Sequence, residues 1–334
     1  MSTGTKTRFG KFGKISMSTL RGKNILVTGA TGLVGSHLVE RLLSMDTGRI
    51  IALSRSRDPE AYFFKNNFDD KVVMAFGDLK DKERVIDIVV KYEINYIFHI
   101  AAQQIVATAF VNPYETLATN IMGTVHILEA ARMSPYIQGV VVASSDKAYG
   151  KDCTVALEDQ PLRGDHPYDV SKSCTDLLAL TYAKTYNLPV TISRFGNIYG
   201  PGDLNFNRII PGLMKAAIKN EVLELRSDGS FKRDYVYVKD VVDGYICLAE
   251  QIDKAKGEAF NFSSGFNFSV LDLIEKTSQI IGEKIEYKIV NNQKNEIPEQ
   301  SLDFAKAEKV LGWKSKYNFE QGILETYSWY KTCF

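Results

Sequence analysis

The sequence contains few cysteines, and charge of neither sign dominates it. Its four cysteines, Cys153, Cys174, Cys247 and Cys333, are scattered over 334 residues without paired spacing. This pattern excludes a disulfide-rich secreted scaffold and favours reduced thiols in a cytoplasmic protein. The four histidines show no ligand spacing with the cysteines, so we predict no metal site. A formal net charge of +1 argues against a nucleic-acid-binding surface.

Long apolar runs are also missing. No stretch of 18 apolar residues occurs, which excludes a membrane-spanning helix. Residues 1–21 carry basic residues and glycines with no apolar core behind them, so we expect a disordered leader rather than a targeting peptide. What is present is an apolar fraction of 45%, which is enough for the core of one large α/β domain and a smaller lobe.

A glycine-rich turn stands near the start of the chain. The apolar run 24–27 precedes Thr-Gly-Ala-Thr-Gly-Leu-Val-Gly (28–35), and a helical pattern, 36–45, follows. Glycines let the backbone approach a pyrophosphate closely, and the helix N-terminus faces its negative charge. The order of strand, turn and helix therefore predicts dinucleotide binding. The alternative is an ordinary turn between a strand and a helix.

Strands and helices alternate along the next part of the chain. We predict strands at 50–53, 72–76, 96–100, 139–143 and 190–194, with helices at 81–92, 116–132 and 168–186. This alternation predicts an α/β fold with a doubly wound parallel (Rossmann) sheet. Ligands of such sheets lie beyond the carboxyl ends of the strands, where the glycine turn meets residues 99–103, 144–147 and 195–197. His99 is expected to be a packed, hydrogen-bonded residue rather than a catalyst.

The composition changes after residue 194, where glycine and proline become frequent. We expect a dinucleotide-binding domain, 22–198 plus about 235–263, and a smaller α/β C-terminal lobe for the substrate, about 199–234 and 264–334. In this second half, helices are predicted at 238–250 and 319–331, and strands at 232–238 and 259–263.

Tyr168 and Lys172 stand four residues apart at the start of a helical pattern, so they share one face of a helix. A lysine ammonium there favours the phenolate form of the tyrosine, as does the positive ring of an oxidised nicotinamide. Lowering the pKa of a phenol from ~10 to ~7 takes roughly 4 kcal/mol of differential stabilisation. The pair therefore predicts a tyrosine base that takes a proton from a sugar hydroxyl.

The strand at 50–53 ends in Ser54, Arg55, Ser56 and Arg57. An acidic residue at this point binds the ribose diol of NAD, whereas arginine suits the 2′-phosphate of NADP. The sequence thus predicts NAD or NADP as cofactor, with NADP slightly favoured by Arg55 and Arg57. The alternative is that both arginines lie in solvent.

Five motifs occur together in this chain. They are Thr-Gly-x-x-Gly-x-x-Gly (28–35), His-Ile-Ala-Ala-Gln (99–103), Asn-Ile-Met-Gly-Thr (120–124), Tyr-x-x-x-Lys (168–172) and Arg-Phe-Gly-Asn-Ile-Tyr-Gly-Pro-Gly (194–202). Together they resemble the extended short-chain dehydrogenase/reductase family of nucleotide-sugar epimerases and dehydratases. The resemblance starts near Gly22 and covers almost the whole remaining chain. It implies a nicotinamide cofactor and a nucleotide-sugar substrate.

Within that family, the segment after the fifth strand distinguishes activities. The dTDP-glucose 4,6-dehydratases carry Thr-Asp-Glu there, and this chain carries Ser145, Asp146 and Lys147. The Asp-Lys pair is similar to CDP-glucose 4,6-dehydratases and to some UDP-N-acetylglucosamine 4,6-dehydratases, and the run 202–211 is closer to the CDP-glucose type. The resemblance therefore implies a nucleotide-hexose 4,6-dehydratase. The alternatives are a 4-epimerase, which usually lacks this pair, a redox-silent scaffold, and a pair of charges on an exposed loop.

The resemblance also implies a role for each catalytic residue. Tyr168 takes the C4 hydroxyl proton, Lys172 lowers the tyrosine pKa and binds the cofactor ribose, and Ser145 orients the C4 oxygen. Asp146 protonates the departing C6 hydroxyl. Lys147 removes the C5 proton if it is neutral, or stabilises the enolate if it is charged. The product is a 4-keto-6-deoxy sugar nucleotide.

The implied binding residues fall into two groups. Cofactor contacts are expected from Gly29, Thr31, Gly32, Leu33, Val34, Ser54, Arg55, Asp78, Leu79, Ala101, Ala102, Gln103, Asn120, Tyr168 and Lys172. Substrate contacts are expected from Gln104, Ser145, Asn197, Asn205, Arg208 and Arg233. For Arg233 the alternative is a surface ion pair with Asp234. A homodimer is expected, because helices 116–132 and 168–186 resemble the pair that forms a four-helix interface in this family.

Overall fold

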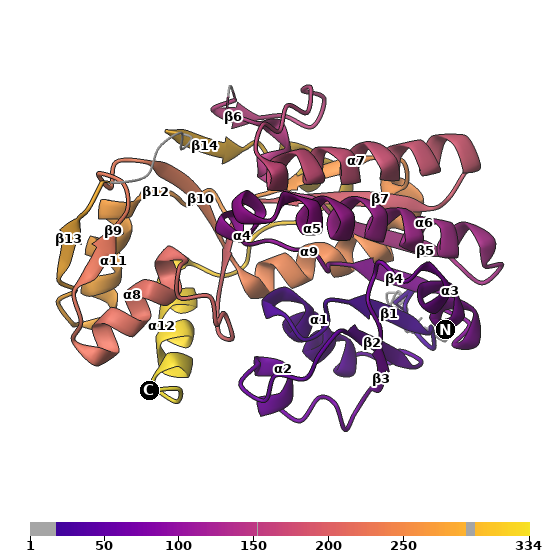
Figure 1. Cartoon of the computed structure of the whole chain (residues 1–334), viewed down its shortest axis with the longest axis horizontal. Coiled ribbons are helices and arrows are strands. Elements are labelled where there is room, and N and C mark those ends of the chain that lie inside the picture. The colour runs from indigo at the N-terminus through magenta and orange to yellow at the C-terminus, as the bar shows by residue number, and fades with distance from the viewer. Residues whose placement is uncertain (1–17, 152, 292–297) are drawn as a thin grey trace, which may run out of the picture.

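A seven-stranded parallel sheet forms the centre of the protein (Figure 1). The computed structural model describes residues 18–151, 153–291 and 298–334, and the strand order is β11-β7-β5-β4-β1-β2-β3. The members are β1 (Ile25–Thr28), β2 (Ile50–Ser54), β3 (Val73–Phe76), β4 (Tyr96–His99), β5 (Gly139–Ala143), β7 (Val190–Phe195) and β11 (Ala259–Phe262). The chain builds the sheet outward from β1 to β3, and then from β4 to β11 on the other side of β1. This order confirms the predicted doubly wound sheet.

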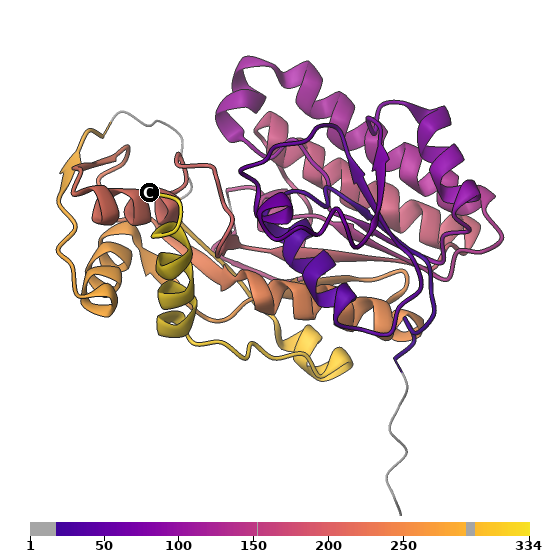
Figure 2. The same ribbon diagram turned by 90° about the horizontal axis from the view of Figure 1, so that it is seen from below.

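Helices cover both faces of this sheet (Figure 2). One face packs against α1 (Leu33–Leu43), α9 (Val238–Glu250) and α10 (Ile252–Ala255), and the other against α3 (Lys82–Lys91), α6 (Gly123–Met133) and α7 (Pro167–Tyr186). Because both faces are covered, the strands are mostly apolar runs, although β7 also carries the buried polar residues Thr191, Ser193 and Arg194. Their predicted ends therefore lie within one residue of the observed ends.

The predicted single helix at 116–132 is interrupted. The chain forms α5 (Pro113–Leu117), a π-helical turn η1 (Ala118–Met122) and then α6. Asn120 lies buried in this turn, where its Nδ2 donates to Gln103 O at 3.0 Å and to Ser171 Oγ at 2.9 Å. Such turns are rare and often accompany functional sites. Hydrophobic periodicity does not reveal one, because it does not record the hydrogen-bond partners of a polar side chain such as Asn120.

A smaller lobe lies to the left of the main sheet in Figure 1. It contains α8 (Ile209–Lys219), α11 (Val270–Ile281), α12 (Phe319–Tyr330) and the strand pair β9 (Leu223–Leu225) and β13 (Tyr287–Ile289). A second sheet connects the two parts in the order β12 (Asn267–Ser269), β10 (Lys232–Tyr237), β14 (Glu299–Leu302) and β6 (Val155–Ala156), with β8 (Asn197–Tyr199) paired to β10. The remaining elements are α2 (Tyr62–Lys65), α4 (Val106–Val111), η2 (Asp146–Tyr149) and η3 (Ala307–Leu311). Since β10 passes directly into α9, no linker separates the lobe from the main sheet; the predicted residue limits of the two domains stay a prediction.

The N-terminal end of the described chain is packed. The predicted disordered leader, 1–21, lies outside the described residues as far as position 17. Leu20 is fully buried, and Arg21 Nε lies 2.7 Å from Asp46 Oδ2, so positions 18–21 belong to the folded domain and the leader was predicted too long. In the described ranges, no helix is long and apolar enough to cross a bilayer, and no cluster of three His, Cys, Asp or Glu residues is arranged to bind a metal ion.

Candidate active site

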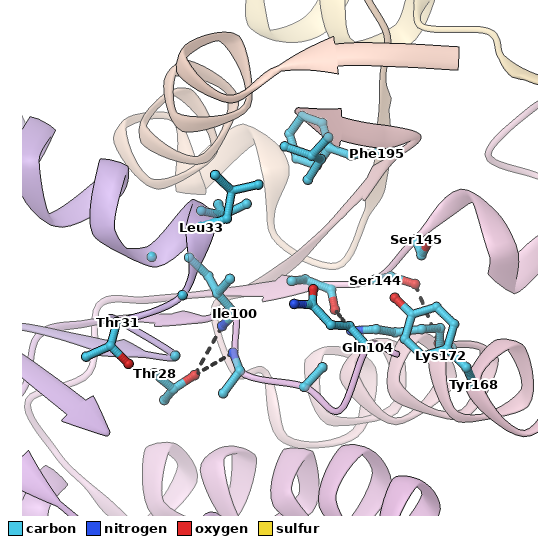
Figure 3. A pocket seen from close by; sticks show the side chains of 18 of the residues that line it. Thr28, Thr31, Leu33, Ile100, Gln104, Ser144, Ser145, Tyr168, Lys172 and Phe195 are labelled. Atoms are coloured by element: carbon cyan, nitrogen blue, oxygen red, sulfur yellow. Dashed lines mark hydrogen bonds between the residues drawn. The ribbon is translucent and has the colours of Figure 1, made fainter. Parts of the chain in front are cut away.

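One cavity of about 530 Å³ opens at the carboxyl ends of the parallel strands. Most predicted site residues line it: Gly29, Thr31, Gly32, Leu33, Val34, Ser54, Arg55, Asp78, Leu79, Ala101, Ala102, Gln104, Ser145, Asp146, Lys147, Tyr168, Lys172, Asn197 and Arg208. Figure 3 shows Tyr168, Lys172 and Ser145 together at one end, and Thr31 and Leu33 at the other. Gln103, Asn120, Asn205 and Arg233 are not among the lining residues.

The glycine turn brings a helix N-terminus to the cavity. Gly29 has a φ of 68°, and a Cβ at this position would lie 2.9 Å from the Cα of Ala101. A Cβ on Gly35 would lie 2.1 Å from Gly29 O, so both positions require glycine. Gly32 caps α1 without a side-chain hydrogen bond, and the first turn of the helix has no acidic residue. The free backbone N–H groups of this turn therefore fit a pyrophosphate.

The two arginines after β2 lie in different environments. Arg55 lines the cavity, with its guanidinium 4.0 Å from Glu115 and its side chain 60% exposed. Arg57 instead forms an ion pair with Asp69 at 2.8 Å and lies over the ring of Phe64. Of these two arginines, Arg55 is therefore the one at the cavity.

Two residues predicted to bind the cofactor support the loop after β4. Asn120 Oδ1 accepts from Gln103 N at 2.7 Å, so together with the contacts described above it ties this loop to α7.

His99, at the end of β4, is buried between the hydroxyls of Thr28 at 2.9 Å and Thr124 at 3.0 Å. Burial, reinforced by the Lys172 charge, lowers the pKa of His99 to about 3. The histidine is neutral and packed, as predicted.

Tyr168 and Lys172 share a buried face at the start of α7. The Lys172 ammonium donates to Ala143 O at 2.7 Å and lies 6.0 Å from the centroid of the Tyr168 ring. Burial raises the pKa of Tyr168 to about 12, and the Asp146 carboxylate adds to the rise, while Arg208 and a hydrogen bond with Ser145 oppose it. Burial also lowers the pKa of Lys172 to about 8. Tyr168 is therefore protonated at neutral pH unless a further positive charge lies beside it.

Asp146 and Lys147 form a buried pair and not a pair on an exposed loop. Their side chains are 4% and 20% exposed, and Lys147 Nζ lies 2.8 Å from Asp146 Oδ2. Ser145 Oγ donates to Asp146 Oδ1 at 2.8 Å. The predicted alternative of solvated surface charges is therefore wrong. A carboxylate, an ammonium and a hydroxyl lie beside Tyr168. Such groups can act as general acids and bases on a bound substrate.

The far side of the cavity is formed by Asn197 on β8 and by the start of α8. Arg208 caps α8 without a side-chain hydrogen bond to the helix, and no acidic residue stands in its first turn. Arg208 Nη1 pairs with Asp203 Oδ2 at 2.9 Å, and Asn205 N donates to Asp203 Oδ1 at 3.0 Å. Asn205 thus supports the turn that carries Arg208. Arg233 Nη1 donates to Lys232 O at 2.8 Å, outside the cavity lining.

Sequence reasoning missed a group of lining residues that are mainly apolar or aromatic. They include Ile198, Tyr199, Tyr235 and Tyr245. Most belong to core runs whose only signal is hydrophobicity. Ile100, Ser144 and Phe195, which also line the cavity, belong to the strand-end segments 99–103, 144–147 and 195–197 that the sequence placed at the ligand site.

Asp234 is a buried acid just outside this site. Burial raises its pKa from 3.8 to about 7, with Asp146 adding to the rise and Ser263, Leu302 and Lys147 opposing it. Since the folded-state pKa is raised, its contribution to stability is full below about pH 4 and is lost as pH rises through about 7. Asp234→Asn mimics the neutral acid, so it should leave stability unchanged near pH 4.

At about pH 8 the same variant should be stabler than the parent protein by about 1–3 kcal/mol. Thermal melts at the two pH values measure the difference, and Asp253→Asn, at a side chain that is 93% exposed, is the control. Equal melting temperatures of Asp234→Asn and the parent at pH 8 would contradict the raised pKa.

The chain is similar to several known proteins. The family model described as GDP-mannose 4,6 dehydratase matches residues 26–326. A CDP-glucose 4,6-dehydratase from Salmonella typhimurium is 30% identical over 93% of this chain and 91% of its own. Longer curated relatives also match, and this chain spans about half of their length, 48%.

Two solved structures share the fold. A dTDP-glucose 4,6-dehydratase from Bacillus anthracis in complex with NAD has a TM-score of 0.81 and 28% identity, covering 93% of this chain and 97% of that one. A UDP-glucose 4-epimerase from Thermotoga maritima with UDP-glucose has a TM-score of 0.83 and 27% identity, covering 93% of this chain and 99% of that one. Both reactions modify the hexose of a nucleotide sugar.

Proposed function

Because this chain belongs to the GDP-mannose 4,6 dehydratase family, among the extended short-chain dehydrogenases/reductases, we propose that it is a nucleotide-hexose 4,6-dehydratase. The proposed substrate is CDP-glucose or a related nucleotide hexose, and the product is its 4-keto-6-deoxy form. The observation that carries the proposal is the buried Asp146–Lys147 pair beside Tyr168 in the cavity.

Oxidation at C4 is the first proposed step. A bound nicotinamide supplies a hydride acceptor and, in its oxidised form, a positive ring charge. The α1 N-terminus and Arg55 are suited to hold its phosphates. Tyr168 takes the proton of the C4 hydroxyl, and Ser145 orients that oxygen. Because burial, together with the neighbouring charges, raises the tyrosine pKa to about 12, Lys172 and the ring charge together must lower it for the base to act at neutral pH.

Elimination across C5 and C6 is the second step. The C4 ketone makes the C5 proton acidic, and Asp146, in its protonated form, donates a proton to the departing C6 hydroxyl. Lys147 either removes the C5 proton or stabilises the enolate that forms. The sugar then regains at C6 the hydride that it lost at C4, and C5 regains a proton, so the net change is the loss of one water molecule. On the far side of the cavity, Arg208 and the α8 N-terminus suit the substrate diphosphate.

A nucleotide-sugar 4-epimerase is the second candidate, supported by the likeness to a UDP-glucose 4-epimerase. It would use the same tyrosine and lysine but needs no acid at C6. The deciding experiment incubates the protein separately with CDP-, dTDP-, UDP- and GDP-hexoses. A product lighter by one water supports the dehydratase. A product with inverted C4 and an intact C6 hydroxyl would establish the epimerase instead.

We further propose that NADP binds at least as well as NAD, because Arg55 lines the cavity after β2. Competition binding of the two cofactors measures this preference. Arg55→Ala should weaken NADP binding by about 10-fold or more, as loss of a charge-assisted hydrogen bond does. Arg57→Ala is the matched control and should change little, since that guanidinium pairs with Asp69. A strong preference of the parent protein for NAD would contradict the proposal.

We propose a homodimer formed through α5, α6 and α7. Large apolar side chains are exposed on these helices, among them Tyr114 at 78%, Met133 at 55% and Leu177 at 56%. Light scattering at micromolar concentration should give twice the chain mass, and Leu177→Glu should give the mass of one chain because it buries a charge in the interface. A single-chain mass for the parent protein would contradict the dimer.

A further inference from the structure

Lys147 is held by a residue from a distant part of the chain. Its Nζ lies 2.6 Å from Oε1 of Gln300, on β14, in addition to its contact with Asp146. Gln300 is fully buried, and 153 positions separate the two residues in the sequence. The contact therefore joins the second sheet to the segment that carries the proposed acid and base.

The orientation of the Gln300 amide follows from its other partners. Its Nε2 donates to Asp146 O at 3.0 Å and is 3.5 Å from Gly150 O. Backbone carbonyls only accept hydrogen bonds, so the NH₂ group must face them and the amide oxygen must face Lys147. Gln300 therefore presents an acceptor to the lysine and fixes the backbone of η2 at the same time.

Two acceptors then define the geometry of the lysine nitrogen. An ammonium has three N–H bonds, and a neutral amine has two N–H bonds and one lone pair. Asp146 Oδ2 and Gln300 Oε1 take two of these positions. The third position, whether a proton or a lone pair, is left for the cavity that Lys147 lines.

We propose that Gln300 is a positioning residue that aims the proton-exchanging side of Lys147 at the substrate. The proposal rests on the proposed dehydratase function and assigns Gln300 to the C5–C6 elimination alone. C4 oxidation uses Tyr168 and Lys172, whereas the amide of Gln300 bonds to Lys147, Asp146 and Gly150. Without the amide, Asp146 alone holds the lysine nitrogen, and a misplacement of about 1 Å in such a group can cost ~10²-fold in rate.

Gln300→Met tests this assignment, because methionine has a similar length and cannot hold the ammonium. In a single turnover with CDP-glucose, or with the nucleotide hexose found to be the substrate, nicotinamide reduction should stay within about twofold of the parent rate. Water loss should slow by about 10- to 100-fold, so reduced cofactor accumulates. Ser301→Ala is the control on the same strand, where Ser301 Oγ donates to Thr154 O at 3.1 Å, and it should change neither step.

A second measurement does not depend on turnover. NMR of isotope-labelled lysine side chains should show a slowly exchanging Lys147 ammonium in the parent protein, identified by its loss in Lys147→Arg. Gln300→Met should abolish that signal through faster exchange with water. A parallel fall of both chemical steps, or water loss at the parent rate, would overturn the proposal. If no nucleotide hexose loses water, the dehydratase function fails, and an unchanged Lys147 signal in Gln300→Met would separately overturn the positioning role.

Discussion

Tyr168→Phe is expected to reduce turnover by about 10²–10⁴-fold, the usual contribution of a general base. The substitution removes the phenolic oxygen and keeps the ring that packs at the start of α7. Cofactor binding should survive, because the α1 N-terminus and the loop after β4 are untouched. Turnover is measured as product formed per unit time, and bound nicotinamide by titration of the purified variant.

Tyr182→Phe is the matched control for this variant. Tyr182 lies on the same helix, but its hydroxyl donates to Glu129 at 2.8 Å and does not line the cavity. The control should turn over at nearly the parent rate. A near-parental rate for Tyr168→Phe would remove Tyr168 from the mechanism.

Asp146→Asn should separate oxidation from elimination. The amide keeps the shape of the carboxylate and can still accept from Lys147, but it cannot donate a proton to the C6 oxygen. Hydroxide is a poor leaving group, so water loss should slow by about 10²–10⁴-fold. The first hydride transfer should remain measurable, and reduced nicotinamide should accumulate and be visible by its absorbance.

Asp165→Asn serves as the control, since Asp165 forms a half-exposed ion pair with Lys151 at 2.8 Å. This control variant should eliminate water from the substrate at the parent rate. Unchanged dehydration by Asp146→Asn would sink the assignment of the acid. The Asp146→Asn variant, together with the product formed by the unmutated protein, also distinguishes the two candidate functions, because an epimerase needs no acid at this position.

The main sheet could be predicted because its strands are buried on both faces and are bounded by glycine-rich or polar turns. The glycine turn could be placed for a different reason, because its glycines are required by the backbone. Gly29 needs a positive φ, and Gly35 needs close packing. Local patterns also placed Tyr168 and Lys172 on one helix face. Each of these features depends on residues close together in the sequence.

The features that were missed depend on contacts between distant residues. In the π-helical turn, Asn120 bonds to Gln103 and Ser171, which lie on other parts of the fold. The ion pair of Arg57 with Asp69 was likewise not predicted. Gln300 carries no sequence signal, because only the folded sheet brings it to Lys147. Periodicity and motif spacing therefore did not predict the hydrogen-bond and ion-pair partners of the polar side chains in this site.

The strand β11 comes from a late part of the sequence, and this limits where the chain can be cut into fragments that fold. The strand completes the main sheet beside β7, with Phe260 opposite Ser193, although 67 positions separate them in the sequence. A fragment that ends at residue 198 would lack β11 and also α9, which covers β5 and β7. Its last strand would be a bare edge with an uncovered apolar face, a template for aggregation. On the ribosome, likewise, the cofactor-binding sheet stays incomplete until more than three quarters of the chain, through Phe262, has been synthesised.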